Sequence, residues 1–554
     1  MVFSFPAASN WIRITQLTVV VLPAYPSSRL SLATLSLKSY KVYASQIASS
    51  ATTDGRNLVE HGSLKLLEWE KVCDVVASFA ATVPGKEATR EQLLLTDRTY
   101  EDSLMLLKES KAAVDMHNHG GCRLFFTGVN LLLVESAIRS ARRRLPLRGD
   151  EAVAVAAMLE LVEALQTNLK AAIKEDSDWY DRCMPLSQVI MELHGNKQLG
   201  KMIRKLVDDD GSVKDSASSS LKRARDQVRL LENRLNQLMD SIIRKEKSFN
   251  SSLEVSNADG RWCIRSDASE RMSFEGLMLS RDSGKRNILE PLVAVPLNDE
   301  LLQAKGSVAK AETEVLMKLT EKMIEDFDAI ETLPNNIIYL DTINARAAYS
   351  LSFNGAYPYL YRVKDNSNSA AEPINGTFSD CVLYMSKVYH PLLLHHHRAK
   401  LKEAMKNKRN GNGVTSEVHP PVPVDFIIAR KTKVVIITGP NTGGKTICLK
   451  TIGLAALMAK SGLYVLSSES IQIPWFDAVY ADIGDEQSLS QSLSTFSGHL
   501  KQISNIRASS TQESLVLLDE VRFQIIGSGP AQIHWKEPHL AWRFWSLFLP
   551  AALF

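Results

Sequence analysis

A strand, a glycine loop and a helix that follow one another directly constrain this chain most. Val434–Ile437 is a continuous apolar run, which predicts a buried strand. Gly439, Gly444, Lys445 and Thr446 then have the full P-loop spacing, and an amphipathic helical pattern follows. In such a loop, backbone N–H groups surround phosphate oxygens, while the lysine reaches the outer phosphates and the threonine hydroxyl ligates Mg²⁺. The sequence therefore predicts a site for a nucleoside triphosphate and Mg²⁺.

The whole loop is expected to contact the nucleotide. Its residues are Gly439, Pro440, Asn441, Thr442, Gly443, Gly444, Lys445 and Thr446.

A later strand pattern supplies carboxylates. Ser514–Leu518 is followed directly by Asp519 and Glu520. In P-loop enzymes such a strand places the first carboxylate near Mg²⁺ and the second where it activates water. The alternative is a strand that only happens to end in acids. Leu463–Leu466 is a further strand-like run between the two motifs.

Composition narrows the class of protein. With 554 residues, 45% apolar and 23% charged, the chain is typical of a soluble globular protein of two to four domains. The net charge of +3 says little about partners. The six cysteines never form CxxC, which argues against a zinc site and a disulfide framework. No run of 18 or more uncharged apolar residues occurs, so we expect no transmembrane helix and no membrane partner.

The N-terminal segment has a different composition. Residues 1–53 contain no Asp or Glu, are rich in Ser and Thr, and carry scattered Arg and Lys. This composition predicts an organelle transit peptide over 1–55, for a chloroplast first and a mitochondrion second. A disordered tail without a targeting role is the alternative.

Helical patterns dominate from about Ser63, and we expect a helical core and lever domain over 56–380. Between Ser218 and Lys247 the apolar spacing alternates between three and four residues, as in a coiled-coil seam. A second stripe, Ala304 to Leu319, has helical spacing. We therefore predict an antiparallel arm over about 217–330. The strand-like segments Arg261–Arg265 and Phe274–Ser280 predict a small β tip. The seam residues are Leu221, Ala224, Val228, Leu231, Leu235, Leu238 and Ile242.

The arm is locally basic. From Lys197 to Lys247 there are 13 Lys/Arg against 8 Asp/Glu. On charge alone, a solvated coiled-coil face is the better interpretation, and contact with nucleic-acid phosphates is the alternative. The candidates for phosphate contact are Arg223, Arg225, Arg229, Arg234, Arg244, Lys245 and Lys247. Beyond the arm, Arg398–Arg409 is expected to be an exposed linker, and the nucleotide-binding domain to occupy 381–520.

Together, these motifs resemble the MutS family of DNA-binding ATPases. The P-loop, Asp482-Ile-Gly-Asp-Glu-Gln487 and Ser494-Thr-Phe496 are similar to its ATPase motifs, and His390-Pro391 to its domain entrance. The helical core begins at Leu66, which leaves no room for a mismatch-reading domain and is similar to the type-2 branch. The implied fold is mixed: a long α-helical core and lever domain with a coiled-coil clamp arm, then a partial α/β P-loop ATPase domain of the ABC type.

The resemblance also implies roles. The chain would form a homodimer, or a dimer with a full-length homologue, that grips duplex or branched DNA mainly through its backbone and couples the grip to ATP and Mg²⁺. Thr446 and Asp519 would hold the metal, and Glu520 would be the general base. Gln487 would sense the γ-phosphate, and Ser494 would act on the partner subunit's nucleotide. The resemblance raises the weight of DNA contact for the basic arm.

The chain departs from the family after Glu520. The family continues with Gly-Ala-Gly-Thr-Asp-Pro, whereas this chain has Val521-Arg-Phe-Gln and a divergent tail over 521–554. We expect a truncation; a short membrane-attaching tail is the alternative. A sheet cut here would have an exposed edge. Nucleotide binding is then expected to survive better than hydrolysis, and no nuclease activity is expected.

Three functions compete. The first is an ATP-dependent DNA-binding protein of mismatch repair or recombination. The second is an ATPase clamp on RNA or the ribosome. The third is a non-catalytic product that pairs with a full-length homologue. A transporter ATPase is disfavoured, because Leu493-Ser-Thr-Phe496 is not an LSGGQ-type signature.

Overall fold

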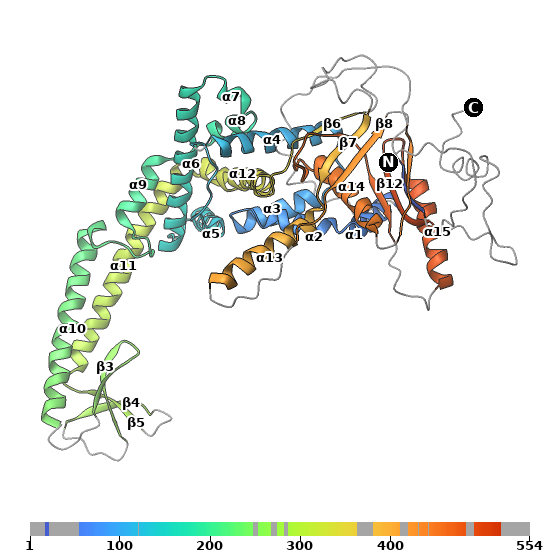
Figure 1. Cartoon of the computed structure of the whole chain (residues 1–554). Coiled ribbons are helices and arrows are strands. Elements are labelled where there is room, and N and C mark those ends of the chain that lie inside the picture. Colours follow the sequence, from blue (N-terminus) through green and yellow to red (C-terminus); the bar gives the residue numbers. More distant parts are fainter. Residues whose placement is uncertain are drawn as a thin grey trace, which may run out of the picture. The chain divides into compact units, whose positions relative to one another are not determined.

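The computed structural model describes eleven stretches of the chain. These are residues 17–21, 55–119, 121–246, 253–267, 274–281, 286–362, 381–409, 419–429, 432–440, 443–483 and 492–521. They confirm a mixed fold of helices and several small sheets (Figure 1). The chain divides into two compact units: unit 1 is Met1–Leu124, Glu175–Gln188 and Tyr339–Phe554, and unit 2 is Phe125–Lys174 and Val189–Ile338.

Unit 2 is mostly helical. Its elements are α5 (Leu131–Arg142), α6 (Gly149–Glu175), the second part of α8 (Leu186–Glu192), α9 (Lys197–Leu206), the 3₁₀ turn η3 (Asp215–Ala217), α10 (Ser219–Glu246), α11 (Val295–Glu325) and the first part of α12 (Phe327–Ser352). α6 is long and apolar enough to cross a membrane by length and composition, and half of its most apolar window is buried. A core helix of a soluble protein passes the same test, so this finding alone is weak support for a membrane span.

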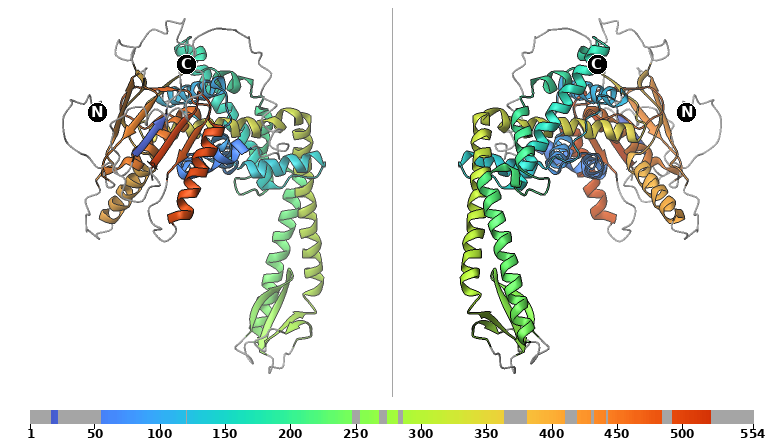
Figure 2. Two further views of the ribbon diagram at one scale, coloured as in Figure 1. Left: turned by 90° about the vertical axis from the view of Figure 1, so that its right-hand side faces the viewer. Right: turned by 90° about the vertical axis from the view of Figure 1, so that its left-hand side faces the viewer.

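Helices α10 and α11 lie side by side and run antiparallel (Figures 1 and 2). The apolar stripes that the sequence predicts are their buried faces. Leu221, Leu231 and Leu235 of α10 are fully buried, and Val315 and Leu319 of α11 are at most 4% exposed. Spacings of three and four residues place these side chains on one face of each helix, where burial removes them from water.

A four-stranded antiparallel sheet joins α10 to α11. Its strands are β2 (Glu254–Ala258), β3 (Arg261–Asp267), β4 (Gly276–Arg281) and β5 (Arg286–Pro291), in the order β2-β3-β5-β4. The two strands predicted for the β tip are present as β3 and β4. Buried Asn298 of α11 attaches the sheet to the helix: its amide donates to Trp262 O at 3.0 Å and to Glu290 Oε1 at 2.8 Å.

Unit 1 packs helices around two sheets. The helices are α1 (Gly55–Leu66), α2 (Trp69–Ala77), α3 (Val83–Leu94), α4 (Tyr100–Asn118), α7 (Trp179–Arg182), the end of α12, α13 (Pro391–Arg409), α14 (Lys445–Lys460) and α15 (Ser492–Ser509). Local signals begin several of them. Thr99 and Asp102 form a capping box at α4, and the Thr82 side chain accepts from Gly85 N at the start of α3.

The two sheets of unit 1 have four strands each. One has the order β11-β12-β1-β9, from β11 (Val479–Asp482), β12 (Leu515–Val521), β1 (Leu17–Val21) and β9 (Val434–Ile437). The other has the order β6-β10-β7-β8, from β6 (Pro358–Tyr361), β10 (Ile471–Pro474), β7 (Cys381–Val388) and β8 (Val424–Ala429). β1 lies within the segment that the sequence predicts to be a transit peptide.

Three local predictions were wrong. The apolar run Val434–Ile437 is the predicted strand β9, but it is not buried: Ile436 is 47% exposed and its three neighbours are half-buried. Leu463–Leu466 is buried, but it forms only an isolated bridge between Val465 and Ala356. Its first amide instead closes the end of α14, because Leu463 N donates to Met458 O past the positive-φ residue Gly462. The basic run Arg398–Arg409, expected to be a linker, is the second part of α13.

Close packing of α14 against β12 positions the glycine loop that precedes α14. A Cβ atom at Gly453 of α14 would lie 2.7 Å from Leu517 Cδ1 and 3.0 Å from Leu67 Cδ2. Only a residue without a side chain lets the helix approach this near. The surrounding core is apolar, with Leu449, Leu454 and Leu517 at 0% exposure. Helix α14, which follows the glycine loop, and strand β12, which carries Asp519, therefore pack into one apolar core.

Candidate nucleotide site and basic arm

The P-loop joins the end of β9 to the start of α14. Gly444 is the N-cap of α14 and has a φ of +78°, a conformation that favours glycine. The turn closes with Gly443 N donating to Pro440 O at 3.0 Å. Gly439 and Pro440 lie before the turn, and Asn441 and Thr442 lie outside the described residues. The local order of strand, loop and helix is the predicted one.

Lys445 turns its side chain back over the loop. It is only 7% exposed, and its ammonium group donates to Gly439 O and Pro440 O at 2.9 Å each. A buried ammonium group requires such partners, because burying a charge without hydrogen bonds is very costly. Two carbonyl oxygens of the loop therefore already bind this cation.

Thr446 and Asp519 meet at the same end of the sheet. Thr446 Oγ1 donates to Asp519 Oδ2 at 2.5 Å, and Asp519 is 5% exposed on β12. The structure thus brings together the two side chains that the resemblance names as Mg²⁺ ligands. Glu520 follows on β12, but its side chain lies outside the described residues, as do Gln487 and the side chain of Ser494 on α15.

A second carboxylate contact was not predicted. His499 of α15 lies with Nδ1 3.2 Å from both carboxylate oxygens of Asp482, which ends β11. Burial raises the pKa of the Asp482 carboxyl, and the nearby His499 opposes that shift. Nothing in the local pattern signals this pair, because its members meet only when α15 packs against β11.

The described residues fit a phosphate group and Mg²⁺. A Cβ atom added at Gly439 or Gly444 would meet no atom within 4 Å, so open space lies against the loop. Hydroxyl and carboxylate oxygens, as in Thr446 and Asp519, are ligands that Mg²⁺ prefers. The described ranges contain no group of three or more His, Cys, Asp or Glu residues suited to a metal. A Mg²⁺ ion at the loop would take its other ligands from phosphates and water.

The basic residues of the arm differ in their surroundings. Arg225 is half-buried and bridges two acids, donating to Asp215 and, at 2.6 Å, to Glu312 of α11. Arg229 donates to Asp215 at 3.1 Å, and both arginines lower the pKa of that carboxyl. Arg223, Arg234, Arg244 and Lys245 are exposed, whereas Lys247 lies outside the described residues. Arg225 therefore already uses its charge in contacts within the arm.

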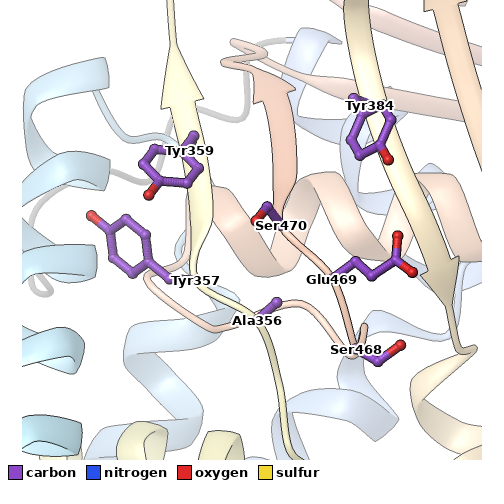
Figure 3. Close-up of a pocket in the computed structure, with 7 residues that line it drawn as sticks. All are labelled: Ala356, Tyr357, Tyr359, Tyr384, Ser468, Glu469 and Ser470. Atoms are coloured by element: carbon purple, nitrogen blue, oxygen red, sulfur yellow. The ribbon is translucent and has the colours of Figure 1, made fainter. Parts of the chain in front are cut away.

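A tyrosine-lined pocket lies elsewhere in unit 1 (Figure 3). Its volume is about 530 Å³, and none of its lining residues belongs to the P-loop or to β12. Glu469 points toward the side of β7 and pairs with Lys387 at 2.7 Å. Burial raises the pKa of Tyr357. The lining residues are Ala356, Tyr357, Tyr359, Tyr384, Ser468, Glu469 and Ser470. We assign this pocket no role in nucleotide binding.

Comparison with known proteins agrees with these motifs. Residues 435–530 match the family model MutS domain V. A protein named endonuclease MutS2 from Synechocystis sp. is 31% identical over 489 residues, which is 85% of this chain and 54% of the relative. Those of Halothermothrix orenii and Ligilactobacillus salivarius are 30% and 29% identical, over 86% and 83% of this chain and 54% and 52% of the relatives.

The chain spans about half the length of the curated relatives it matches. The matched region nevertheless includes Gly439–Thr446, Asp482 and Asp519. With this domain match and these relatives, the chain belongs to the MutS family, as a MutS2-type member.

Proposed function

We propose that this protein binds ATP with Mg²⁺ at the P-loop of unit 1 and binds DNA through the basic arm of unit 2. One observation carries the proposal: Lys445 is buried within its loop, and the adjacent residue Thr446 contacts Asp519. These groups offer a cation to phosphate oxygens and hard oxygen ligands to Mg²⁺. ATP would supply the phosphoryl group that the family's enzymes transfer to water.

We assign the remaining roles by resemblance. Glu520 is the general base, Gln487 senses the γ-phosphate, and Ser494 acts on the nucleotide of a partner subunit, either a second copy or a full-length homologue. The domains are a helical core and lever domain over 56–380, with a coiled-coil clamp arm and β tip over about 217–330, and a P-loop ATPase domain over 381–520. The N-terminal composition supports a chloroplast location, with a mitochondrion as the alternative.

We propose further that nucleotide binding survives better than ATP hydrolysis in this chain. The residues after Glu520, Val521-Arg-Phe-Gln, differ from the loop by which family members contact the partner's site. Because the family's site is completed across two subunits, a changed contact loop impairs hydrolysis more than binding. Turnover equal to that of a full-length family member, and lost in Lys445→Ala, would contradict this part.

DNA contact would use the exposed basic residues of the arm. Arg223, Arg234 and Arg244 have their charge available to phosphates, whereas Arg225 serves the helix pair. Contacts to phosphates do not depend on base sequence, so binding would be largely sequence-independent and strongly weakened by salt. Its role would be in mismatch binding, repair or control of recombination.

Fluorescent ATP binding with Mg²⁺ tests the nucleotide site. Lys445→Ala should weaken binding at least tenfold, because the variant lacks the buried cation of the loop. Lys402→Ala, at an exposed position of α13, is the matched control and should bind as the wild type does. Equal affinity of the wild type and Lys445→Ala would refute the proposed site.

Competition at fixed salt tests the nucleic-acid ligand. Branched DNA and duplex DNA should each compete for the wild type at least as strongly as ribosomal RNA does, and branched DNA should compete at least as strongly as duplex DNA. A second experiment measures DNA affinity over a range of salt concentrations. In the double variant Arg234→Ala and Arg244→Ala, the slope of log affinity against log salt should fall by the equivalent of about two phosphate contacts. Preference for ribosomal RNA over both DNAs would instead establish the RNA clamp.

A further inference from the structure

Strand β1 occupies a slot between the two strands that carry the nucleotide site. It pairs antiparallel with β9, where Val20 faces Val435, and antiparallel with β12, where Val20 faces Leu517. β9 and β12 are therefore parallel to each other and separated by one strand. With neighbouring strands about 4.8 Å apart, the slot is about 9.6 Å wide. It admits one strand and no more.

The width of the slot determines the geometry of the site. β9 leads into the P-loop, and β12 carries Asp519. The 2.5 Å contact between Thr446 and Asp519 forms with β1 in place. If β9 and β12 paired directly, one side of the site would move by about 4.8 Å relative to the other. If they stayed apart, both would expose unpaired N–H and C=O groups.

The slot suits an apolar strand. On its β12 side, Leu517 is 0% exposed and Leu518 is 4% exposed, and each belongs to an apolar core cluster, so the strand in the slot adjoins core residues. The inserted sequence is Leu-Thr-Val-Val-Val, and β-branched residues favour the extended conformation. Its backbone supplies pairing partners to both neighbours over four residues on each side.

We propose that Leu17–Val21 is an exchangeable strand, and that the slot between β9 and β12 is an acceptor for one antiparallel apolar strand. When this strand is present, Asp519 stays in register with the P-loop; when it is removed, the register is lost. Processing within the N-terminal segment thereby becomes a switch: cleavage before Leu17 retains the strand, and cleavage after Val21 empties the slot. The effect on nucleotide affinity rests on the proposed function, whereas the strand exchange does not.

Hydrogen exchange on the full chain tests the insertion. Val20→Pro removes a backbone donor from the middle of the strand, and Val20→Thr is the matched control that keeps the donor and the β-branched shape. In Val20→Pro, amides of β9 and β12 should exchange at least tenfold faster, with wild-type rates in the sheet β2-β3-β5-β4. Wild-type rates in β9 and β12 would overturn the proposal.

If Val20→Pro unfolds unit 1, hydrogen exchange on that variant cannot test the strand. A chain cut after the strand then provides the test. A protease site is introduced between Ser36 and Ser45 of the full chain and cut under native conditions. The N-terminal fragment should co-elute with the remainder and be displaced by excess wild-type peptide of residues 13–25. The same peptide with Val20→Pro should not displace it. Immediate separation of the fragment, without faster exchange in β9 and β12, would overturn the proposal.

Fluorescent ATP then distinguishes the two proposals. Displacement of the fragment by the wild-type peptide should leave affinity unchanged, and Val20→Pro in the full chain should lower it at least tenfold. If the wild type binds no ATP, the proposed function fails, while the exchange data still decide the strand. If ATP affinity is unchanged in a Val20→Pro chain whose β9 and β12 exchange faster, the link between the strand and the site fails.

Discussion

His390 is a buried histidine directly before α13, beside Lys450 and Glu68. It is 7% exposed, and its Nδ1 has no hydrogen-bond partner among the described residues. Burial lowers its pKa from 6.5 to about 4, with the nearby Lys450 acting in the same direction. The folded chain therefore holds this imidazole neutral at a pH where an unfolded chain would protonate it.

This depressed pKa predicts a pH dependence of stability. Below pH 6.5 His390 takes up a proton in the unfolded state, whereas in the folded state it stays neutral until the pH falls to about 4. The stabilisation is complete above pH 6.5 and is lost as the pH falls toward 4. His390→Gln should lose up to about 3 kcal/mol less free energy of unfolding over this window than the wild type. Urea unfolding of unit 1 at pH 7 and pH 4.5 measures the difference.

The exposed His61 of α1 provides the control for that measurement. His61→Gln should keep the wild-type pH dependence. If His390→Gln and the wild type lose equal stability between the two pH values, His390 does not titrate as its burial requires. The residue itself was visible in the sequence as His390-Pro391, but its environment was not, because Glu68 and Lys450 are distant along the chain.

At the scale of elements, helix α10 contains two neighbouring leucines that differ in burial. Leu231 is fully buried against α11 and the β sheet, while its neighbour Leu230 is 44% exposed. Leu231→Ala should destabilise the helix pair by about 2–4 kcal/mol, because a cavity adds to the lost transfer free energy. Leu230→Ala should change stability by about 0.5 kcal/mol or less. Hydrogen exchange in α10 and β3 reports both values, and equal effects would show that this face is not the core.

The elements also show which patterns were informative. The α10 and α11 stripes repeat over many turns, so periodicity alone located their buried faces. The four-residue run Leu463–Leu466 was too short to separate a strand from a buried cap of α14. The basic run Arg398–Arg409 was mistaken for a linker because its charge hid a helix whose apolar contacts come from the residues before it.

At the scale of the whole molecule, the proposed sites belong to different compact units. Unit 1 carries Lys445 and Asp519, and unit 2 carries the basic arm. If ATP controls the grip on DNA, saturating ATP with Mg²⁺ should change DNA affinity by about 5- to 150-fold, and DNA should change ATP affinity by the same factor. Anisotropy of labelled duplex and of fluorescent ATP measures the two factors. Lys445→Ala should remove the coupling, and a DNA affinity indifferent to ATP in the wild type would exclude it.

The sequence by itself determined the P-loop, the acid-bearing strand, the apolar stripes of the arm and the family. Each is encoded by residues that are neighbours along the chain, so spacing alone specifies the local structure. Only the tertiary structure decided the His499–Asp482 pair, the structural partners of Arg225 and the insertion of β1 between β9 and β12. Such contacts depend on which distant segments share one core, and no short-range pattern records that choice.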